Sequence, residues 1–147
     1  MTTILFYYET EEPYGCFSNF SAHAVYLKGI IWPTTEHYFQ AQKFAGTPLE
    51  ERVRLAKTPE EAKRLGKINP ARPDWKQIRD EIMLEAVRAK FTQHPNLREI
   101  LLSTGDDLMA ENAPRDDYWG IGENGRGTNR LGQILMQVRS ELRGQVK

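Results

Sequence analysis

The feature that most constrains the fold is an apolar stripe with helical spacing between Asp74 and Thr92. Five apolar residues recur at intervals of three or four, and three more widen the stripe: Trp75, Ile78, Ile82, Ala86 and Ala89, then Met83, Val87 and Phe91. This spacing predicts an amphipathic helix with one face in a hydrophobic core. A chain of 147 residues is long enough to bury a substantial core around such a helix.

Helix-start signals recur on both sides of this segment. Thr47-Pro48 and Thr58-Pro59 each place a threonine at an N-cap position before a proline. We expect helices over residues 35–45, 47–56, 58–65, 74–92, 95–105 and 129–143. Short β-rich runs predict strands over residues 3–8, 24–27, 30–32 and 108–111. The sequence therefore predicts an α+β fold, mostly helical, with a small β element, in one domain over residues 1–147.

Charge and cysteine content exclude several classes of protein. Lys+Arg and Asp+Glu both number 20, so no net basic field draws the chain to nucleic acid or to an anionic membrane. Any anionic ligand must be held locally. Cys16 is the single cysteine, which excludes an internal disulfide and fits a reducing compartment, so we expect a cytoplasmic location. No run approaches the ~18 apolar residues of a membrane span, so we expect no membrane partner.

The segment Trp32–Phe44 combines a helix start with a polar stripe among aromatic rings. At about 100° per residue, Glu36, Gln40 and Lys43 fall on one stripe of a helix that Thr34 or Thr35 would cap. The carboxylate and the amine can then meet one small molecule, with Phe39 and Phe44 beside the stripe. The alternative is an ordinary amphipathic helix with a solvated polar face. His37, on this same helix, is expected to be a packed or hydrogen-bonded residue rather than a catalyst.

Residues 120–125 match the pattern G-x-G-x-x-G, but they do not indicate a dinucleotide site. The rest of the chain lacks the alternation of strands and helices that such a fold needs, and only 22 residues follow Gly125. Glycines such as Gly120 and Gly122 would still let backbone N–H groups approach a ligand, and the N-terminus of the next helix would suit a phosphate. The alternative is a flexible connecting loop.

Two further segments combine polar and aromatic residues. Residues 114–119 supply carboxylates and Trp119, a flat ring that could stack on a base; the alternative is an acidic turn with a core tryptophan. In residues 15–20, Asn19 could hold a ribose hydroxyl or cap a turn. The three histidines show no metal-ligand spacing, so we expect neither a metal nor another cofactor.

Together these segments resemble the NADAR, or YbiA-like, family of N-glycosidases. The resemblance covers nearly the whole chain and rests on Phe6-Tyr7, GCFSNF at 15–20, WPTTEHYFQAQKF at 32–44, Lys90-Phe91 and DDYWGIGENGRGTNRLGQILMQVR at 116–139. It implies a compact, mostly helical α+β domain without a metal. It also implies hydrolysis of the N-glycosidic bond of ribosylamino-pyrimidine 5′-phosphates, which are early riboflavin intermediates, with release of ribose 5-phosphate.

The resemblance assigns roles to three residues. Lys43 would form a Schiff base with ribose C1, Glu36 would be the general acid and base, and Asp116 would orient the ribose or a water molecule. The alternative chemistry is direct displacement through an oxocarbenium-like state, with Glu36 and Asp116 as a carboxylate pair.

Binding contacts are expected from six further residues, all of them in segments read as loops or at helix starts. We assign Asn19 and Asn129 to the sugar or phosphate, Trp119 to base stacking, Gly120 and Gly122 to backbone contacts, and Arg72 to a phosphate clamp.

Two other functions remain open. Other members of the family remove ADP-ribose from guanine bases, which would make ADP-ribosylated guanine in nucleic acid the substrate. A non-catalytic ADP-ribose-binding module would keep the pocket without needing Glu36 or Lys43. Oligomeric state does not follow from the sequence.

Overall fold

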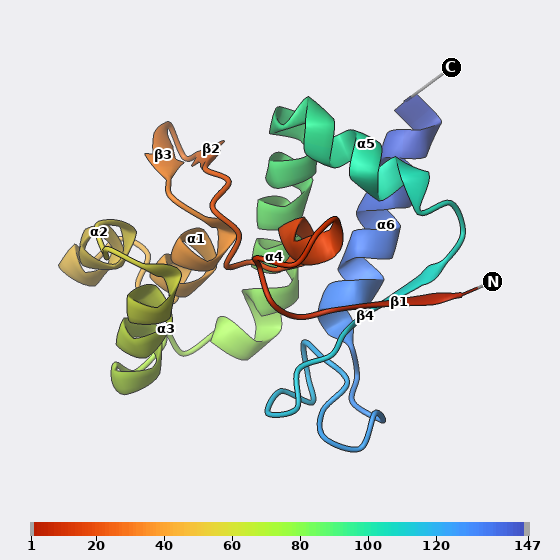
Figure 1. Ribbon diagram of the computed structural model, residues 1–147. Coiled ribbons are helices and arrows are strands. Elements are labelled where there is room, and N and C mark those ends of the chain that lie inside the picture. Colours follow the sequence, from red (N-terminus) through yellow and green to blue (C-terminus); the bar gives the residue numbers. More distant parts are fainter. Residues whose placement is uncertain (1, 146–147) are drawn as a thin grey trace.

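The computed structural model describes residues 2–145 (Figure 1). Within this range the helices are α1 Thr35–Gln42, α2 Pro48–Arg54, α3 Pro59–Ile68, α4 Trp75–Gln93, α5 Pro95–Ser103 and α6 Arg130–Gln145. The strands are β1 Thr3–Phe6, β2 Val25–Leu27, β3 Ile30–Trp32 and β4 Leu108–Glu111, and residues Tyr14–Phe17 form a turn of 3-10 helix. The predicted α+β, mostly helical class is confirmed. None of the described helices is long and apolar enough to cross a membrane.

Helix α4, the segment with the long apolar stripe, is the central element. It packs against α1 and β2 on one side and against α5 and α6 on the other. In Figure 1, helices α1 to α3 and the strands β2 and β3 accordingly lie to one side of α4, and the remaining elements lie to the other. The buried residues of α4 include Met83, Val87 and Phe91, as its periodicity predicted.

Two separate pairs of strands make up the β structure. β1 pairs with β4 in parallel, with Thr3 opposite Leu108. β2 and β3 form an antiparallel hairpin. The two residues that join them, Lys28 and Gly29, have φ values of 56° and 78°, as a tight two-residue hairpin turn requires.

The helix starts follow the predicted N-cap residues closely. The hydroxyl of Thr34 accepts the backbone N–H of His37, and that of Thr58 accepts the N–H of Glu61, each at 3.1 Å. Thr47 occupies the N-cap position of α2, but its hydroxyl donates to the carbonyl oxygen of Phe44. Helix α1 ends at Gln42 rather than Ala45 because the chain turns there, while α3 extends past the predicted end to Ile68.

Helix α1 lies between two hydrophobic clusters. Phe39 packs into the cluster that α4, α5 and α6 share, which includes Phe91, Leu131 and Ile134. Tyr38, Ala41 and Phe44 pack into a second cluster, with Trp32, Val53 and Leu65. The two apolar sides of α1 fix its orientation, so its polar stripe must face away from both hydrophobic clusters.

Helix α6 and strand β4 approach so closely at Gly132 that we expect Gly132→Ala to destabilise the protein. A Cβ atom there would lie 2.2 Å from the carbonyl oxygen of Met109 and 2.4 Å from the side chain of Asn129. We expect a loss of about 1–3 kcal/mol in the free energy of unfolding, measured by urea denaturation. Gly144→Ala in the same helix is the matched control, because nothing lies within 4 Å of its Cβ position. An equal effect of the two substitutions would contradict this account of the packing.

Candidate active site

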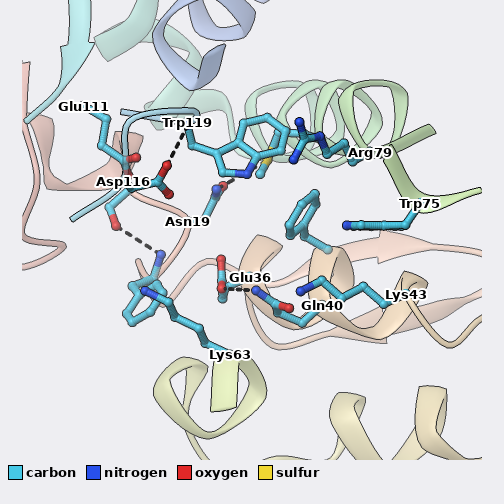
Figure 2. Close-up of a pocket in the computed structure, with 14 residues that line it drawn as sticks. Asn19, Glu36, Gln40, Lys43, Lys63, Trp75, Arg79, Glu111, Asp116 and Trp119 are labelled. Atoms are coloured by element: carbon cyan, nitrogen blue, oxygen red, sulfur yellow. Dashed lines mark hydrogen bonds between the residues drawn. The ribbon is translucent and has the colours of Figure 1, made fainter. Parts of the chain in front are cut away.

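A cavity of about 220 Å³ lies where α1, α3 and α4 meet the segments 18–20 and 111–119 (Figure 2). Its charged lining residues are three carboxylates and three cations: Glu36, Glu111 and Asp116, then Lys43, Lys63 and Arg79. Aromatic rings line it as well, among them Phe39, Trp75 and Trp119. A small space that combines both signs of charge with flat rings suits a polar ligand that carries a ring.

The polar stripe of α1 opens into this cavity rather than into solvent. Glu36 and Gln40 are only 7% and 6% exposed, and the amide Nε2 of Gln40 donates to Oε2 of Glu36 at 2.9 Å. Lys43 is half-buried, and its Nζ donates to the carbonyl oxygen of Gly66 at 3.3 Å. Figure 2 shows the three side chains next to one another along the helix. The alternative of a solvated polar face is therefore wrong.

Burial shifts the pKa values of the two ionisable groups of this stripe in opposite directions. Desolvation raises the pKa of Glu36, and the bond from Gln40 and the charges of Lys63 and Lys43 offset only part of that rise. Desolvation lowers the pKa of Lys43, and the nearby charge of Glu36 offsets part of that fall. Burial thus shifts both groups in the direction of their neutral forms.

The carboxylate of Asp116 is fixed by the chain that follows it. Its Oδ1 accepts the backbone N–H groups of Tyr118 and Trp119, at 3.0 and 2.8 Å. Both bonds end on the same oxygen, so among the described residues Oδ2 has no backbone donor and remains for a ligand. Asp116 therefore presents a preoriented acceptor to the cavity.

Glu111, the last residue of β4, is a third carboxyl group in the cavity. Burial, followed by the charges of Asp116 and Glu36, raises its pKa to about 7. Its backbone is held on both sides, because its N–H donates to Oδ1 of Asn129 and its carbonyl oxygen accepts from the N–H of Ile121. The side chain is thus directed into the cavity by a rigid strand end.

Aromatic packing forms one wall of the cavity. The ring centroid of Phe39 lies 5.1 Å from that of Trp75 and 5.3 Å from that of Trp119. Phe44, expected beside the polar stripe, instead packs into the second hydrophobic cluster and does not line the cavity. Asn19 also lines the cavity, and its Oδ1 accepts the hydroxyl of Thr35 at 2.8 Å.

Comparison with known proteins identifies the family. Residues 5–143 match the NADAR domain. The chain belongs to the NADAR family. A protein of Nostoc punctiforme named as an N-glycosidase is 47% identical over 147 residues, which cover 95% of this chain and 92% of that protein. A riboflavin biosynthesis protein of Zea mays is 39% identical over 99% of this chain but only 26% of its own length.

A solved structure supports the fold assignment within the NADAR family. The N-glycosidase YbiA of Escherichia coli is 44% identical over 95% of this chain and 89% of its own length. The NMR structure of E. coli YbiA matches this chain with a TM-score of 0.90 and 42% identity, over 98% of this chain and 86% of that one. The resemblance drawn from the motifs is therefore confirmed.

The NADAR chain brings together five of the residues assigned to the site from its sequence. These residues all line the cavity: Asn19, Glu36, Lys43, Asp116 and Trp119. They come from three segments. The backbone N–H of Glu36 donates to the carbonyl oxygen of Asn19, and the ring of Phe39 packs against that of Trp119, so both of the other segments contact α1. Their individual roles stay predictions.

The glycine-rich loop lies outside the cavity lining, contrary to expectation. A Cβ atom on Gly120 would lie 2.7 Å from the carbonyl oxygen of Glu111, so this glycine permits close packing of the backbone. The N–H of Gly122 donates to the carbonyl oxygen of Asp116. The first N–H groups of α6, those of Arg130 and Leu131, donate to the carbonyl oxygens of Tyr118 and Trp119. These N–H groups of the helix N-terminus are therefore hydrogen-bonded to the loop and are not directed at a ligand.

Asn129 and Arg72 also lie outside the lining. The amide of Asn129 donates to the carbonyl oxygen of Met109 and accepts the N–H of Glu111, so it joins the loop to β4. The guanidinium of Arg72 pairs with Asp74 at 2.6 Å on the surface. The geometry thus gives both residues structural contacts in place of the expected ligand contacts.

Several lining residues were not identified from the sequence, among them Lys63, Trp75, Arg79 and Glu111. Arg79 and Lys63 lie on helices whose polar residues are indistinguishable from a solvated face. Trp75 was assigned to the apolar stripe of α4, and Glu111 to the end of a strand. Only the packing of α3, α4 and β4 around α1 reveals that these side chains share a cavity. His37 was expected to be hydrogen-bonded, and both of its ring nitrogens are, to Thr34 and to the carbonyl oxygen of Ala56.

We expect Glu111→Gln to stabilise the protein at pH 8 and to change its stability less at pH 5. The folded-state pKa of Glu111, about 7, lies above the value of about 4.3 in an unfolded chain. Above that lower value the unfolded state loses its proton first, so stability falls as the pH rises to about 7 and the loss then stays constant. Replacing the carboxyl group by an amide removes a penalty of about 1–3 kcal/mol at pH 8.

The measurement is the free energy of unfolding of the wild type and the variant at the two pH values. Glu99→Gln is the control, because Glu99 is exposed on α5. A stabilisation by Glu111→Gln that is the same at pH 5 and pH 8 would show that the Glu111 side chain is not desolvated as described.

Proposed function

We propose that this NADAR protein is an N-glycosidase, a hydrolase of N-glycosyl compounds that acts on a small phosphorylated ribosylamine. The specific substrate we propose is a ribosylamino-pyrimidine 5′-phosphate of riboflavin biosynthesis, with ribose 5-phosphate as a product. The reaction is supported by relatives named N-glycosidases, and the substrate by a relative named for riboflavin biosynthesis.

One observation carries the proposal. Glu36 on α1 and Lys43 at its C-cap line one cavity and have pKa values that burial shifts toward the neutral forms. A protonated carboxyl group can donate a proton to a substrate, and a neutral amine can attack a carbon atom. Stabilising the fold alone does not require an acid with a raised pKa and an amine with a lowered pKa at the same cavity.

The chemistry follows from these two groups. The Glu36 carboxyl group donates a proton to the ring oxygen of the ribose, and the C1–O bond of the ring breaks to leave a protonated imine (iminium) between C1 and the exocyclic nitrogen. The neutral Nζ of Lys43 adds to C1, the C1–N bond to the pyrimidine amine breaks, and that amine leaves with a proton. A Schiff base between Lys43 and C1 remains. Water then adds to C1 with Glu36 as the base, and Lys43 is released together with ribose 5-phosphate.

The other cavity residues supply recognition. Asp116 and Asn19 face the sugar hydroxyls as preoriented polar groups. The ring of Trp119 offers a flat face to the pyrimidine.

The cavity size supports the smaller of the substrate candidates. Its volume of about 220 Å³ is below that of most ligand pockets, which favours a mononucleotide-sized substrate over ADP-ribosylated nucleic acid.

We expect sodium borohydride, added during turnover, to attach a reduced sugar phosphate covalently to Lys43. Borohydride reduces a Schiff base to a stable secondary amine, and mass spectrometry of peptides locates the adduct. Lys43→Ala should lose the adduct and about 10³-fold or more in kcat. Lys67→Ala is the matched control, because Lys67 is exposed on the neighbouring helix α3. Full activity of Lys43→Ala would exclude the Schiff base and leave direct displacement by the carboxylate pair.

We expect Glu36→Gln to reduce kcat by about 10²–10⁴-fold while the variant remains folded and still binds ribose 5-phosphate. The amide keeps the shape of the side chain but cannot transfer a proton. Steady-state assays with the pyrimidine substrate and, separately, with ADP-ribosylated guanine DNA give the comparison. Retention of wild-type kcat would exclude Glu36 as the proton donor. Turnover of neither substrate by the wild type would leave a binding module.

A further inference from the structure

The phosphate of the proposed substrate needs a cation, and the cavity offers three: Lys43, Lys63 and Arg79. Lys43 is the residue proposed as the nucleophile. Lys63 acts electrostatically on the carboxyl groups, since its charge lowers the pKa of both Glu36 and Glu111. Lys63 is an exposed residue, and its Nζ lies 5.9 Å from the centroid of the Phe20 ring. A flexible lysine orients a phosphate less well than a fixed guanidinium does, so Arg79 is the stronger candidate.

Arg79 has no anionic partner among the described residues, unlike other arginines on or near α4. Arg88 pairs with Glu141, and Arg130 pairs with Asp80. The Nε of Arg79 is buried, yet within the described range it has no hydrogen-bond partner. A buried guanidinium nitrogen without a partner is costly, because desolvation is not offset by a bond.

The carboxylate next to Arg79 in the chain is already occupied. Oδ1 of Asp80 accepts the hydroxyl of Tyr118 at 2.5 Å, and its Oδ2 accepts Nε of Arg130 at 3.1 Å. These bonds hold the Tyr118 ring in place, and the guanidinium carbon of Arg79 lies 3.7 Å from the centroid of that ring. The ring therefore fixes the guanidinium without neutralising it.

The charges of the cavity are separated in space. Figure 2 shows Arg79 beside Trp119 and near Trp75, with Asp116 and Glu111 on the far side of Trp119. A ligand with a neutral sugar and one anionic group would therefore place its anionic group at Arg79, away from the carboxylates. A guanidinium binds a phosphate through two parallel hydrogen bonds, which suits a fixed, stacked side chain.

We propose that Arg79, held against Tyr118, binds the 5′-phosphate of the substrate and makes the enzyme select phosphorylated over unphosphorylated ribosylamines. The inference rests on the proposed function, since it assigns the phosphate of that substrate to a residue. It gives Arg79 the role that the sequence had assigned to Arg72.

The test compares Arg79→Gln with the wild type on the ribosylamino-pyrimidine 5′-phosphate and on the same compound without its phosphate. Loss of a charged hydrogen-bonded contact predicts that kcat/KM for the phosphorylated compound falls about 10- to 100-fold, chiefly through KM. The value for the unphosphorylated compound should stay within about twofold. Arg79→Lys should retain part of the selectivity, because it keeps the charge but not the fork geometry.

Arg88→Gln is the matched control, because Arg88 lies on the same helix and pairs with Glu141 outside the cavity. Its selectivity should equal that of the wild type, and thermal unfolding should show that each variant is folded. Equal loss on both compounds with Arg79→Gln, or loss of selectivity with Arg72→Gln in its place, overturns the proposal.

A binding measurement separates this inference from the proposed function. Ribose 5-phosphate and ribose are titrated into the wild type and Arg79→Gln and followed by NMR or calorimetry, with no turnover required. The proposal predicts that ribose 5-phosphate binds the wild type about 10- to 100-fold more tightly than the variant, and that ribose binds both alike. Equal affinity of ribose 5-phosphate for the two proteins, or no binding to the wild type, overturns it even if glycosidase activity is found.

Discussion

Helix α1 presents a glutamate and a glutamine, followed by Lys43 at its C-cap, to a cavity although all eight of its own residues are buried. Burying such groups is costly unless each finds a partner. Here Glu36 accepts a bond from Gln40, and Lys43 donates to the carbonyl oxygen of Gly66, whereas Oε1 of Gln40 is buried without a partner among the described residues. Their desolvation is also the largest cause of both pKa shifts, so the burial that the fold must offset is what prepares the proposed chemistry.

The fold holds α1 in this position from several directions. Phe39 and Tyr38 enter different hydrophobic clusters, which prevents rotation of the helix about its axis. Helix α3 can approach closely because its Gly66 has no side chain, and a Cβ atom there would lie 2.0 Å from Oε1 of Gln40. The loop that carries Asp116 and Trp119 is held by its own backbone bonds and by Asn129. The side chains proposed as proton donor, nucleophile and acceptor are therefore positioned by packing within the protein.

Most of the helices and turns of this fold follow from local patterns in the sequence. The stripe of α4, the threonines before α1 and α3, and the Lys28-Gly29 turn each depend on neighbouring residues, so the elements could be predicted. The stripe of Glu36 and Lys43 could be predicted for the same reason. Arg79 and Glu111 could not, because nothing local distinguishes them from surface residues on a helix and at a strand end. The glycine-rich loop misled for the opposite reason, since glycines that permit close packing resemble glycines that admit a ligand.

The most direct test of the account is the ionisation of Lys43, observed by NMR of the side-chain Cε and Nζ nuclei as a function of pH. Assignment follows from loss of the signal in Lys43→Arg. The account predicts that the pKa of Lys43 lies clearly below the ordinary lysine value of about 10.4, because desolvation disfavours the charged amine. If Lys43 instead titrates at that ordinary value, then its amine is solvated and charged, and the proposed nucleophile is excluded.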